Sequence, residues 1–269
     1  MTVIFHQKAS KDIQGFVFYI VKKFKKHLQP PVLIKPNIVS FEQYPTTTHP
    51  KVLECVIKAL FQLGFKKSEI LVGDASAPDS KFAAKEHELA SVSKKFGVRF
   101  VDFVDYKFVR KSALGLRFKV SRFLLEAGSI ISLPVLKTHA WVGITGALKN
   151  MFGFLDEDSR IKAHRKGNVG KIIVAINLIR RPTLSIVNHR LTLVKAQEVR
   201  HGGVKRRGFG IFASLDPVAL DWLGLKLQRK VDKNVERMRA NKLDNLYYDY
   251  IKLAHELGVG SLNYELVEF

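Results

Sequence analysis

The sequence contains one cysteine, Cys55, among its 269 residues. A chain with one cysteine cannot form an internal disulfide, and it cannot supply the cysteines of an iron–sulfur cluster or a zinc finger by itself. We therefore expect no iron–sulfur cofactor from this chain. Cys55 falls on the apolar side of a predicted helix, where a lone cysteine usually behaves as a small hydrophobic residue of the core.

Long hydrophobic runs are also missing. The apolar run at residues 16–21 is six residues long, and four lysines follow it within residues 22–26. Such a run is too short for a membrane span or for the core of a signal peptide. We therefore expect a cytoplasmic protein with no membrane span. With 46% hydrophobic residues, the chain can bury a sizeable core, and the absence of repeats and linkers favours one α/β domain over residues 1–269.

Acidic residues are scarce, since 24 aspartates and glutamates stand against 45 lysines and arginines, for a net charge of +21. The excess is concentrated in the basic block from Arg160 to Arg207, where residues 158–207 hold 13 basic and 2 acidic side chains. Such a field attracts nucleic acid, acidic membranes or phosphorylated small molecules. A lysine-rich, heat-adapted surface explains the same charge, because net charge governs solubility and encounter rather than a specific site.

Short apolar runs indicate the strands of a parallel sheet. They are continuous rather than alternating, which is typical of strands that are buried on both faces. The runs lie at residues 32–34, 70–72, 98–103, 130–133, 184–187 and 210–213. Between the first two, a helix is predicted from Pro50 to Gly64, with Thr47 or Thr48 as its cap. Strand, helix and strand in this order predict a parallel α/β unit.

Further helix signals follow in the last quarter of the chain. Asp216 is a good cap and Pro217 a good first residue for a helix, and residues 246–257 form a second amphipathic stretch before a final strand within residues 262–269. The fold class predicted is α/β, with an open, mostly parallel Rossmann-like sheet and helices on both faces. The C-terminal helix and strand fall within residues 226–269.

Polar residues follow three of the predicted strands at the point where each strand ends. Lys35 and Asn37 follow the first strand, Asp74 follows the second, and Lys137 and His139 follow the strand at residues 130–133. In an open parallel sheet, ligands bind beyond the carboxyl ends of the strands. These side chains are therefore predicted to face one site.

A glycine-spaced turn leads from this loop into a short predicted helix that carries Lys149 and Asn150. If Thr145 caps that helix, the free backbone N–H groups near Gly146 and the positive end of the helix dipole form an anion cradle. The glycine spacing matches neither a Walker nor a dinucleotide motif, so ATP and NAD are not indicated. The alternative is a tight turn with two surface lysines.

No metal site is assigned from the sequence. The acidic run at residues 156–158 is typical of a solvated loop, and a hard-cation site is its alternative. Of the remaining histidines, His164, His189 and His201 do not pair at the four-residue spacing of helix-borne metal ligands.

Together these motifs resemble the domain-of-unknown-function 362 family over roughly residues 32–225. The resemblance rests on Lys35-Pro36-Asn37, Thr47, Thr48 and Pro50, Gly73-Asp74, Leu133-Pro134, Lys137-Thr138-His139, Thr145-Gly146, Lys149-Asn150, Gly153, Asp216-Pro217, Ala219 and Asp221. It implies an α/β fold and adds His164 to the site, but it implies no reaction. This chain departs from the family where Asn188 replaces an aspartate and where Val204, rather than proline, follows Gly202-Gly203. Some members also carry an iron–sulfur module, which this chain lacks.

The resulting hypothesis is an enzyme or ligand-binding protein whose site holds an anionic small molecule with a phosphate or carboxylate group. His139, with Asp74 as its partner, is the acid/base candidate, because imidazole titrates near neutral pH. The ligand-binding residues predicted are Lys35, Asn37, Lys137, Thr145, Gly146, Lys149, Asn150 and His164. The alternatives are a nucleic-acid-binding protein that uses the basic block and a structural or partner-binding protein.

Overall fold

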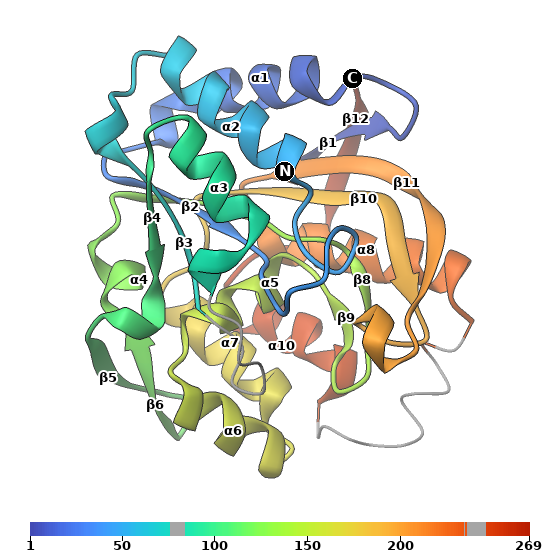
Figure 1. Cartoon of the computed structure of the whole chain (residues 1–269). Helices are drawn as coiled ribbons and strands as arrows, with labels where there is room; N and C mark the ends of the chain where they lie inside the picture. Colours follow the sequence, from blue (N-terminus) through green and yellow to red (C-terminus); the bar gives the residue numbers. More distant parts are fainter. Residues whose placement is uncertain (76–83, 234, 236–245) are drawn as a thin grey trace.

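The computed structural model describes residues 1–75, 84–233, 235 and 246–269 (Figure 1). Within these residues, the main sheet has eight strands in the order β12-β1-β11-β10-β7-β2-β3-β4. Neighbouring strands are parallel, except that β11 pairs antiparallel with both β1 and β10. The predicted open, mostly parallel sheet is therefore confirmed.

The sheet strands are β1 (Thr2–Lys8), β2 (Val32–Pro36), β3 (Ile70–Asp74), β4 (Arg99–Asp102), β7 (Ser129–Leu133), β10 (Leu184–Val194), β11 (Val204–Ser214) and β12 (Tyr264–Glu268). Two hairpins stand apart from it: β5 (Phe108–Ala113) with β6 (Leu116–Ser121), and β8 (Lys137–His139) with β9 (Gly143–Thr145). The helices are α1 (Ile13–Lys23), α2 (Pro50–Gln62), α3 (Glu88–Lys95), α4 (Arg122–Glu126), α5 (Ala147–Asn150), α6 (Glu157–Arg165), α7 (Val169–Ile179), α8 (Pro217–Val231) and α10 (Tyr250–Glu256). Short 3₁₀ turns include Met151–Phe154 and Tyr247–Asp249.

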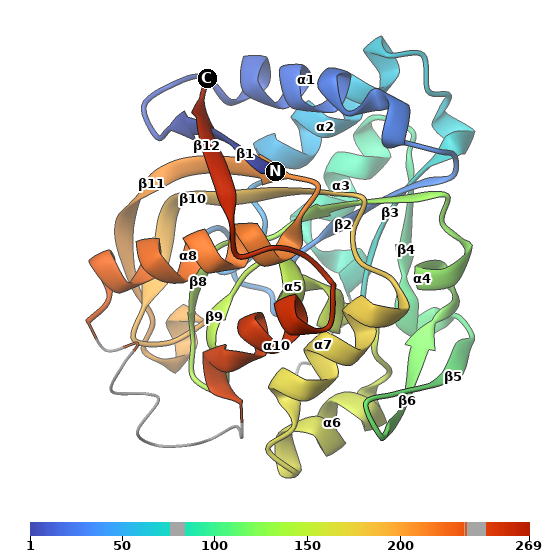
Figure 2. The same ribbon diagram turned by 180° about the vertical axis from the view of Figure 1, so that it is seen from behind.

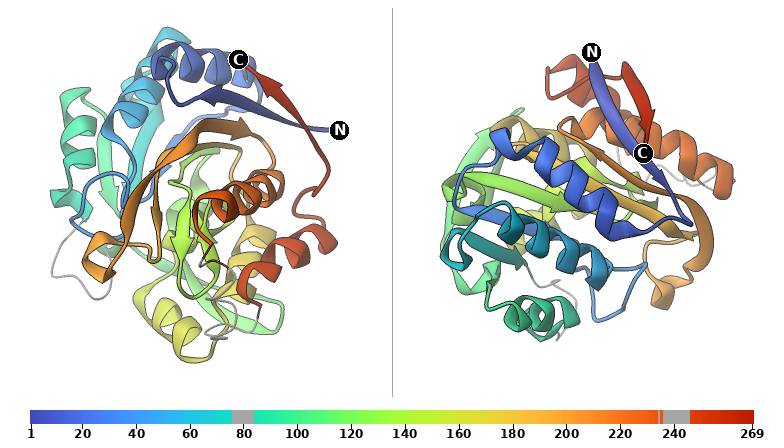
Figure 3. Two further views of the ribbon diagram at one scale, coloured as in Figure 1. Left: turned by 90° about the vertical axis from the view of Figure 1, so that its right-hand side faces the viewer. Right: turned by 90° about the horizontal axis from the view of Figure 1, so that it is seen from above.

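Helices cover both faces of the sheet. Helices α1, α2 and α3 lie on one face, and α5, α7, α8 and α10 lie on the other (Figures 2 and 3). Successive residues of a strand point to opposite faces. In β2, Val32 and Ile34 join the core beneath α1 and α2, whereas Leu33 joins the core beneath α7 and α8. This arrangement explains why the strands are continuously apolar.

Two predicted helix starts had different outcomes. Asp216 caps α8 as predicted, because its side chain accepts hydrogen bonds from the backbone N–H groups of Val218 and Ala219. Pro50 is the first residue of α2, but the cap is His49, so the predicted cap at Thr47 or Thr48 is wrong. The Thr48 hydroxyl instead donates to the carbonyl oxygen of Leu133, which links the segment before α2 to the end of β7.

Some elements were not predicted. The apolar run at residues 16–21 forms the buried face of α1, which packs against α2. Eight of the eleven residues of helix α7 are buried although it lies within the basic block. The acidic run at residues 156–158 is not a loop, since Asp156 caps α6 and the next two residues form its first turn. Negative side chains favour a helix N-terminus, which explains their place.

The C-terminal predictions are confirmed. Residues 247–256 are helical, and β12 adds to the sheet edge in parallel with β1, where Thr2 lies opposite Tyr264. Cys55 is buried and free, as expected for a core residue. Within the described ranges, no helix has both the length and the apolar character needed to cross a bilayer.

Candidate functional site

A cavity of about 390 Å³ lies beyond the carboxyl ends of β2 and β3, between these strand ends and α5, α6 and the β8–β9 hairpin. Nine of the ten predicted site residues line it: Lys35, Asn37, Asp74, Lys137, His139, Thr145, Lys149, Asn150 and His164. Gly146 does not line the cavity. The expectation that ligands bind beyond the carboxyl ends of parallel strands thus located side chains that are more than 100 residues apart in the chain at one cavity.

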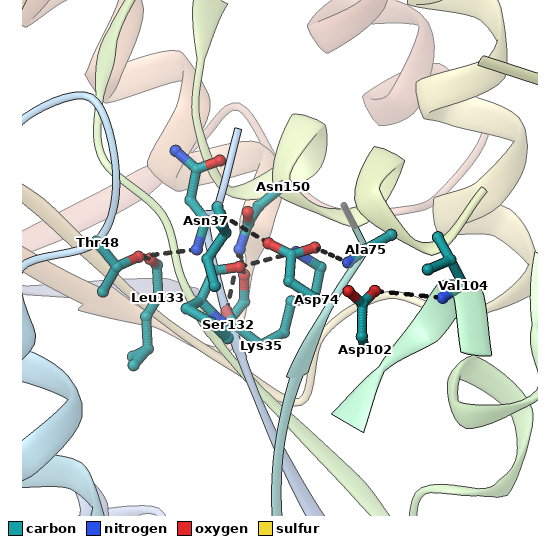
Figure 4. A network of polar contacts seen from close by, with 12 residues as sticks. Lys35, Asn37, Thr48, Asp74, Ala75, Asp102, Val104, Ser132, Leu133 and Asn150 are labelled. Carbon is teal, nitrogen blue, oxygen red and sulfur yellow. Dashed lines mark hydrogen bonds and ion pairs between the residues drawn. The ribbon is translucent and has the colours of Figure 1, made fainter. Parts of the chain in front are cut away.

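The base of the cavity is a buried ion pair. The Nζ atom of Lys35 lies 2.5 Å from Oδ1 of Asp74, and both side chains are almost fully buried (Figure 4). Burial lowers the pKa of Lys35, and the Asp74 carboxylate works against that shift. Gly153 passes directly over the pair, because a Cβ atom at this position would lie 2.6 Å from Oδ1 of Asp74. Only glycine fits this close approach.

The Asp74 carboxyl group contacts Lys35 and two backbone N–H groups, and it makes no hydrogen bond with His139. Its Oδ1 atom also accepts the backbone N–H of Ala75 at 2.8 Å, and Oδ2 accepts that of Ile38 at 2.7 Å. The expected pairing of Asp74 with His139 is therefore absent. Asp74 instead anchors Lys35 and the loop after β2.

Two asparagines tie the strand ends together. The Nδ2 atom of Asn150 donates to Oγ of Ser132 at 2.8 Å and to the carbonyl oxygen of Lys35 at 3.2 Å (Figure 4). The backbone N–H of Asn37 donates to Oγ1 of Thr48 at 2.8 Å. The amide group of Asn150 is thus used to hold α5 against β2 and β7, which is a positioning role.

The anion cradle predicted at the start of α5 is already filled by the protein. Gly146, rather than Thr145, precedes the first turn. Asp221 of α8 accepts the backbone N–H of Ala147 at 2.5 Å and that of Leu148 at 3.0 Å. These amides are therefore not free for a ligand, and Gly146 is needed because a side chain there would collide with Asp221. Burial raises the pKa of Asp221 to about 7.

Two further lysines of the cavity differ in their contacts. The ammonium group of Lys137 is buried and donates to the carbonyl oxygens of Thr46 at 2.5 Å and Gln197 at 2.7 Å. Burial lowers the pKa of Lys137 to about 7. Lys149 makes no hydrogen bond or ion pair with any described residue, and its Nζ atom lies 4.8 Å from the centre of the Phe152 ring. Burial, with the nearby charges of Arg160 and Lys35, lowers the pKa of Lys149 to about 8.

Arg160 is a cavity residue that sequence reasoning did not assign to the site. It lies on α6 with 7% of its surface exposed, and its Nε and Nη2 atoms are buried without a hydrogen-bond partner in the described structure. Buried guanidinium groups are normally paired, so two orphaned donors on a residue that lines the cavity indicate a place for an anion beside it. Its only sequence signal was its position at the start of the basic block.

Two histidines of the cavity present opposite hydrogen-bonding groups. Nδ1 of His139 accepts the backbone N–H of Trp141 at 3.2 Å, so the ring proton belongs on Nε2. Nδ1 of His164 must donate to the carbonyl oxygen of Arg160 at 2.8 Å, so its Nε2 is an acceptor. Burial lowers the pKa of both rings, which keeps them neutral. His139 is thus a donor and His164 an acceptor.

The basic block is partly used for internal contacts. Arg180 donates to the carbonyl oxygens of Leu125 and Gly128, and Arg181 donates to that of Val259. Arg160 faces the cavity. In the described parts of the chain, no group of three or more histidine, cysteine, aspartate or glutamate side chains could hold a metal ion.

Comparison with known proteins gives a family and a fold. The family described as "Domain of unknown function (DUF362)" matches residues 32–226. A thylakoid-associated protein of Synechocystis sp. is 24% identical over 200 residues, which are 71% of this chain and 61% of that protein.

Two solved structures are similar to this chain. The lactate racemase apoprotein of Thermoanaerobacterium thermosaccharolyticum has a TM-score of 0.52 at 11% identity, and the match covers 83% of this chain and 56% of that one. A Thermotoga maritima protein has a TM-score of 0.45 at 14% identity, covering 81% and 57% respectively. The racemase likeness concerns the fold alone. The chain spans about three-fifths of the length of each of these relatives.

Proposed function

This chain belongs to the DUF362 family, and from that premise we propose that its cavity binds a small molecule bearing a carboxylate or phosphate group. The observation that carries the proposal is the Arg160 guanidinium, which is buried with two donors unpartnered. Burial of a charged group without a partner is costly, and an anion in the cavity supplies the missing hydrogen bonds. Lys149, which also lacks a partner among the described residues, adds a second positive charge.

The electrostatic balance of the cavity supports an anionic ligand. Among the described residues, two carboxylates line it, Asp74 and Glu198. The first is neutralised by Lys35 and the second pairs with Arg200 at 2.7 Å. The cationic side chains that line the cavity are Lys35, Lys137, Lys149, Arg160 and Arg165. Among the described lining residues, the five lysines and arginines therefore outnumber the two carboxylates.

The cavity walls also set the size and shape of the ligand. A volume of about 390 Å³ fits a small metabolite rather than a polymer. Trp141 and Phe152 supply aromatic walls, and His164 packs edge-on against both rings. In this proposal, His139 donates a hydrogen bond to the ligand and His164 accepts one.

Isothermal titration calorimetry with oxalate tests the proposal, and the neutral isostere oxamide serves as the control ligand. Oxalate is expected to bind the wild-type chain, whereas oxamide is not. Arg160→Met is expected to weaken oxalate binding by roughly ten- to a hundredfold, since hydrogen bonds to a charged group contribute about 1.5–3 kcal/mol.

Arg180→Met is the matched protein control, because the Arg180 guanidinium donates to backbone carbonyls away from the cavity. This variant should bind oxalate as the wild type does. Equal oxalate affinity in the wild type and Arg160→Met, or no oxalate binding at all, would count against the proposed anion site.

A further inference from the structure

Three lysines with buried or partly buried amines share the cavity, and their contacts separate them. Lys35 is paired with the Asp74 carboxyl group 2.5 Å away. Lys137 is held by two backbone carbonyl oxygens. Lys149 makes no ion pair and no hydrogen bond with a described residue, and its side chain is partly exposed and lines the cavity. Its amine is therefore free to meet a ligand.

The surroundings of Lys149 increase the uncharged fraction of its amine, although most of it stays charged at pH 7. Burial and the charges of Arg160 and Lys35 lower the pKa of Lys149 to about 8. Relative to an ordinary lysine with a pKa of about 10.4, this raises the share of uncharged amine at pH 7 by about two orders of magnitude. Desolvation and a neighbouring cation are the two means by which proteins make a lysine nucleophilic.

We propose that Lys149 is a nucleophile that forms an imine with a small carbonyl compound bearing a carboxylate, a 2-oxo acid, whose carboxylate lies at Arg160. The inference rests on the proposed function, because it places the anionic end of the ligand at the same guanidinium. A carboxylate matches the fork of donors that Nε and Nη2 of Arg160 present.

The histidines of the cavity provide the proton transfers that the step needs. Nζ of Lys149 bonds to the carbonyl carbon, and the carbonyl electron pair moves to oxygen, which accepts a hydrogen bond from Nε2–H of His139. Nε2 of His164 carries the two amine protons, one after the other, to that oxygen. The oxygen leaves as water while the C=N bond forms. One amine and one carbonyl thus give one imine and one water, and nothing is oxidised or reduced.

Reductive trapping tests the inference with pyruvate as the probe. The intact chain is incubated with pyruvate and sodium cyanoborohydride at pH 7, and the modified lysines are located by peptide mass spectrometry. Lys149 is expected to gain the mass of pyruvic acid less one oxygen atom, at a rate roughly a hundredfold above that of an exposed lysine such as Lys94. Excess oxalate should suppress this labelling, because it occupies the same cation.

Lys149→Arg separates the two proposals, since it keeps the positive charge but loses the nucleophile. The variant is expected to bind oxalate and to yield no adduct at residue 149. Oxalate binding to the wild-type chain without an adduct above the level at Lys94 would overturn the imine and leave the anion site standing. A predominant adduct at Lys137 would overturn the assignment to Lys149. If the wild-type chain neither binds oxalate nor forms an adduct, both proposals are overturned.

Discussion

Because the guanidinium of Arg160 lacks a partner among the described residues, its removal is predicted to stabilise the ligand-free protein. Removal of a buried arginine usually destabilises a protein, because its partners are left behind. Here Nε and Nη2 have no protein partner in the described structure, and cationic neighbours line the same cavity. In the absence of ligand, Arg160→Met is therefore expected to raise the free energy of unfolding, although the same substitution weakens anion binding.

The size of the effect follows from the contacts. A buried donor without a partner costs about 1–3 kcal/mol, and two such donors disappear in the variant. Methionine keeps much of the apolar stem, but imperfect packing of its side chain reduces the increase in the free energy of unfolding. We expect a net increase of about 1–3 kcal/mol. For a chain of this size, 1 kcal/mol shifts Tm by roughly 2–4 °C, so Tm should rise by several degrees.

Differential scanning calorimetry of ligand-free protein in a non-coordinating buffer measures the shift. Arg180→Met is again the control and should lower Tm, because Arg180 donates to two backbone carbonyl oxygens that lose their partner. At an oxalate concentration a hundredfold above the wild-type Kd, oxalate should stabilise the wild type and Arg180→Met by about 2.7 kcal/mol, and Arg160→Met by only about 0.4–1.4 kcal/mol. A fall in Tm for Arg160→Met as large as that for Arg180→Met would refute the reasoning.

Three further outcomes test other parts of the site and core. Gly153→Ala should lower the free energy of unfolding by about 1–3 kcal/mol in urea denaturation, because the new Cβ would lie 2.6 and 2.8 Å from the charged atoms of the buried ion pair. Gly15→Ala, where the nearest atom is 3.9 Å away, should not. Asp221→Ala should cost about 2–4 kcal/mol in the same assay, because two buried backbone N–H groups lose their acceptor; an unchanged midpoint would contradict that role. Burial lowers the pKa of His189 to about 4, so the unfolded chain binds more protons between pH 6.5 and 4 and stability falls as pH falls through that range, by about 3 kcal/mol. Unfolding curves of His189→Gln should show a smaller loss, and an identical pH profile would disprove the assignment.

Local patterns in the chain were sufficient for much of the fold. Runs such as residues 32–34 and 130–133 are buried on both sides, so their continuous apolar character predicted parallel strands. The rule that ligands lie beyond strand carboxyl ends then located Lys35, Asp74 and Lys137 at one cavity. These features could be predicted because each depends on neighbouring residues and on the general geometry of a parallel sheet.

Helix α1 shows a limit of that approach. The length of its apolar run at residues 16–21 excludes a membrane span but does not reveal that the same residues pack against α2 as one face of an amphipathic helix. The helix could be recognised only from the surface of α2 that it packs against, and a short segment of sequence does not contain that surface. The cap at His49 was missed for a similar reason, since Thr48 is used in a contact with Leu133 of another strand.

The chemistry of the site shows most clearly what was determined at each level. The sequence by itself determined which polar residues follow the strands, because an apolar run and the polar residues after it lie within one short segment. Only the tertiary structure decided that Asp74 pairs with Lys35 rather than His139, that Asp221 fills the amides at α5, and that Arg160 is left without a partner. Charge pairing and desolvation depend on atoms from distant segments, so no pattern within one segment specifies them.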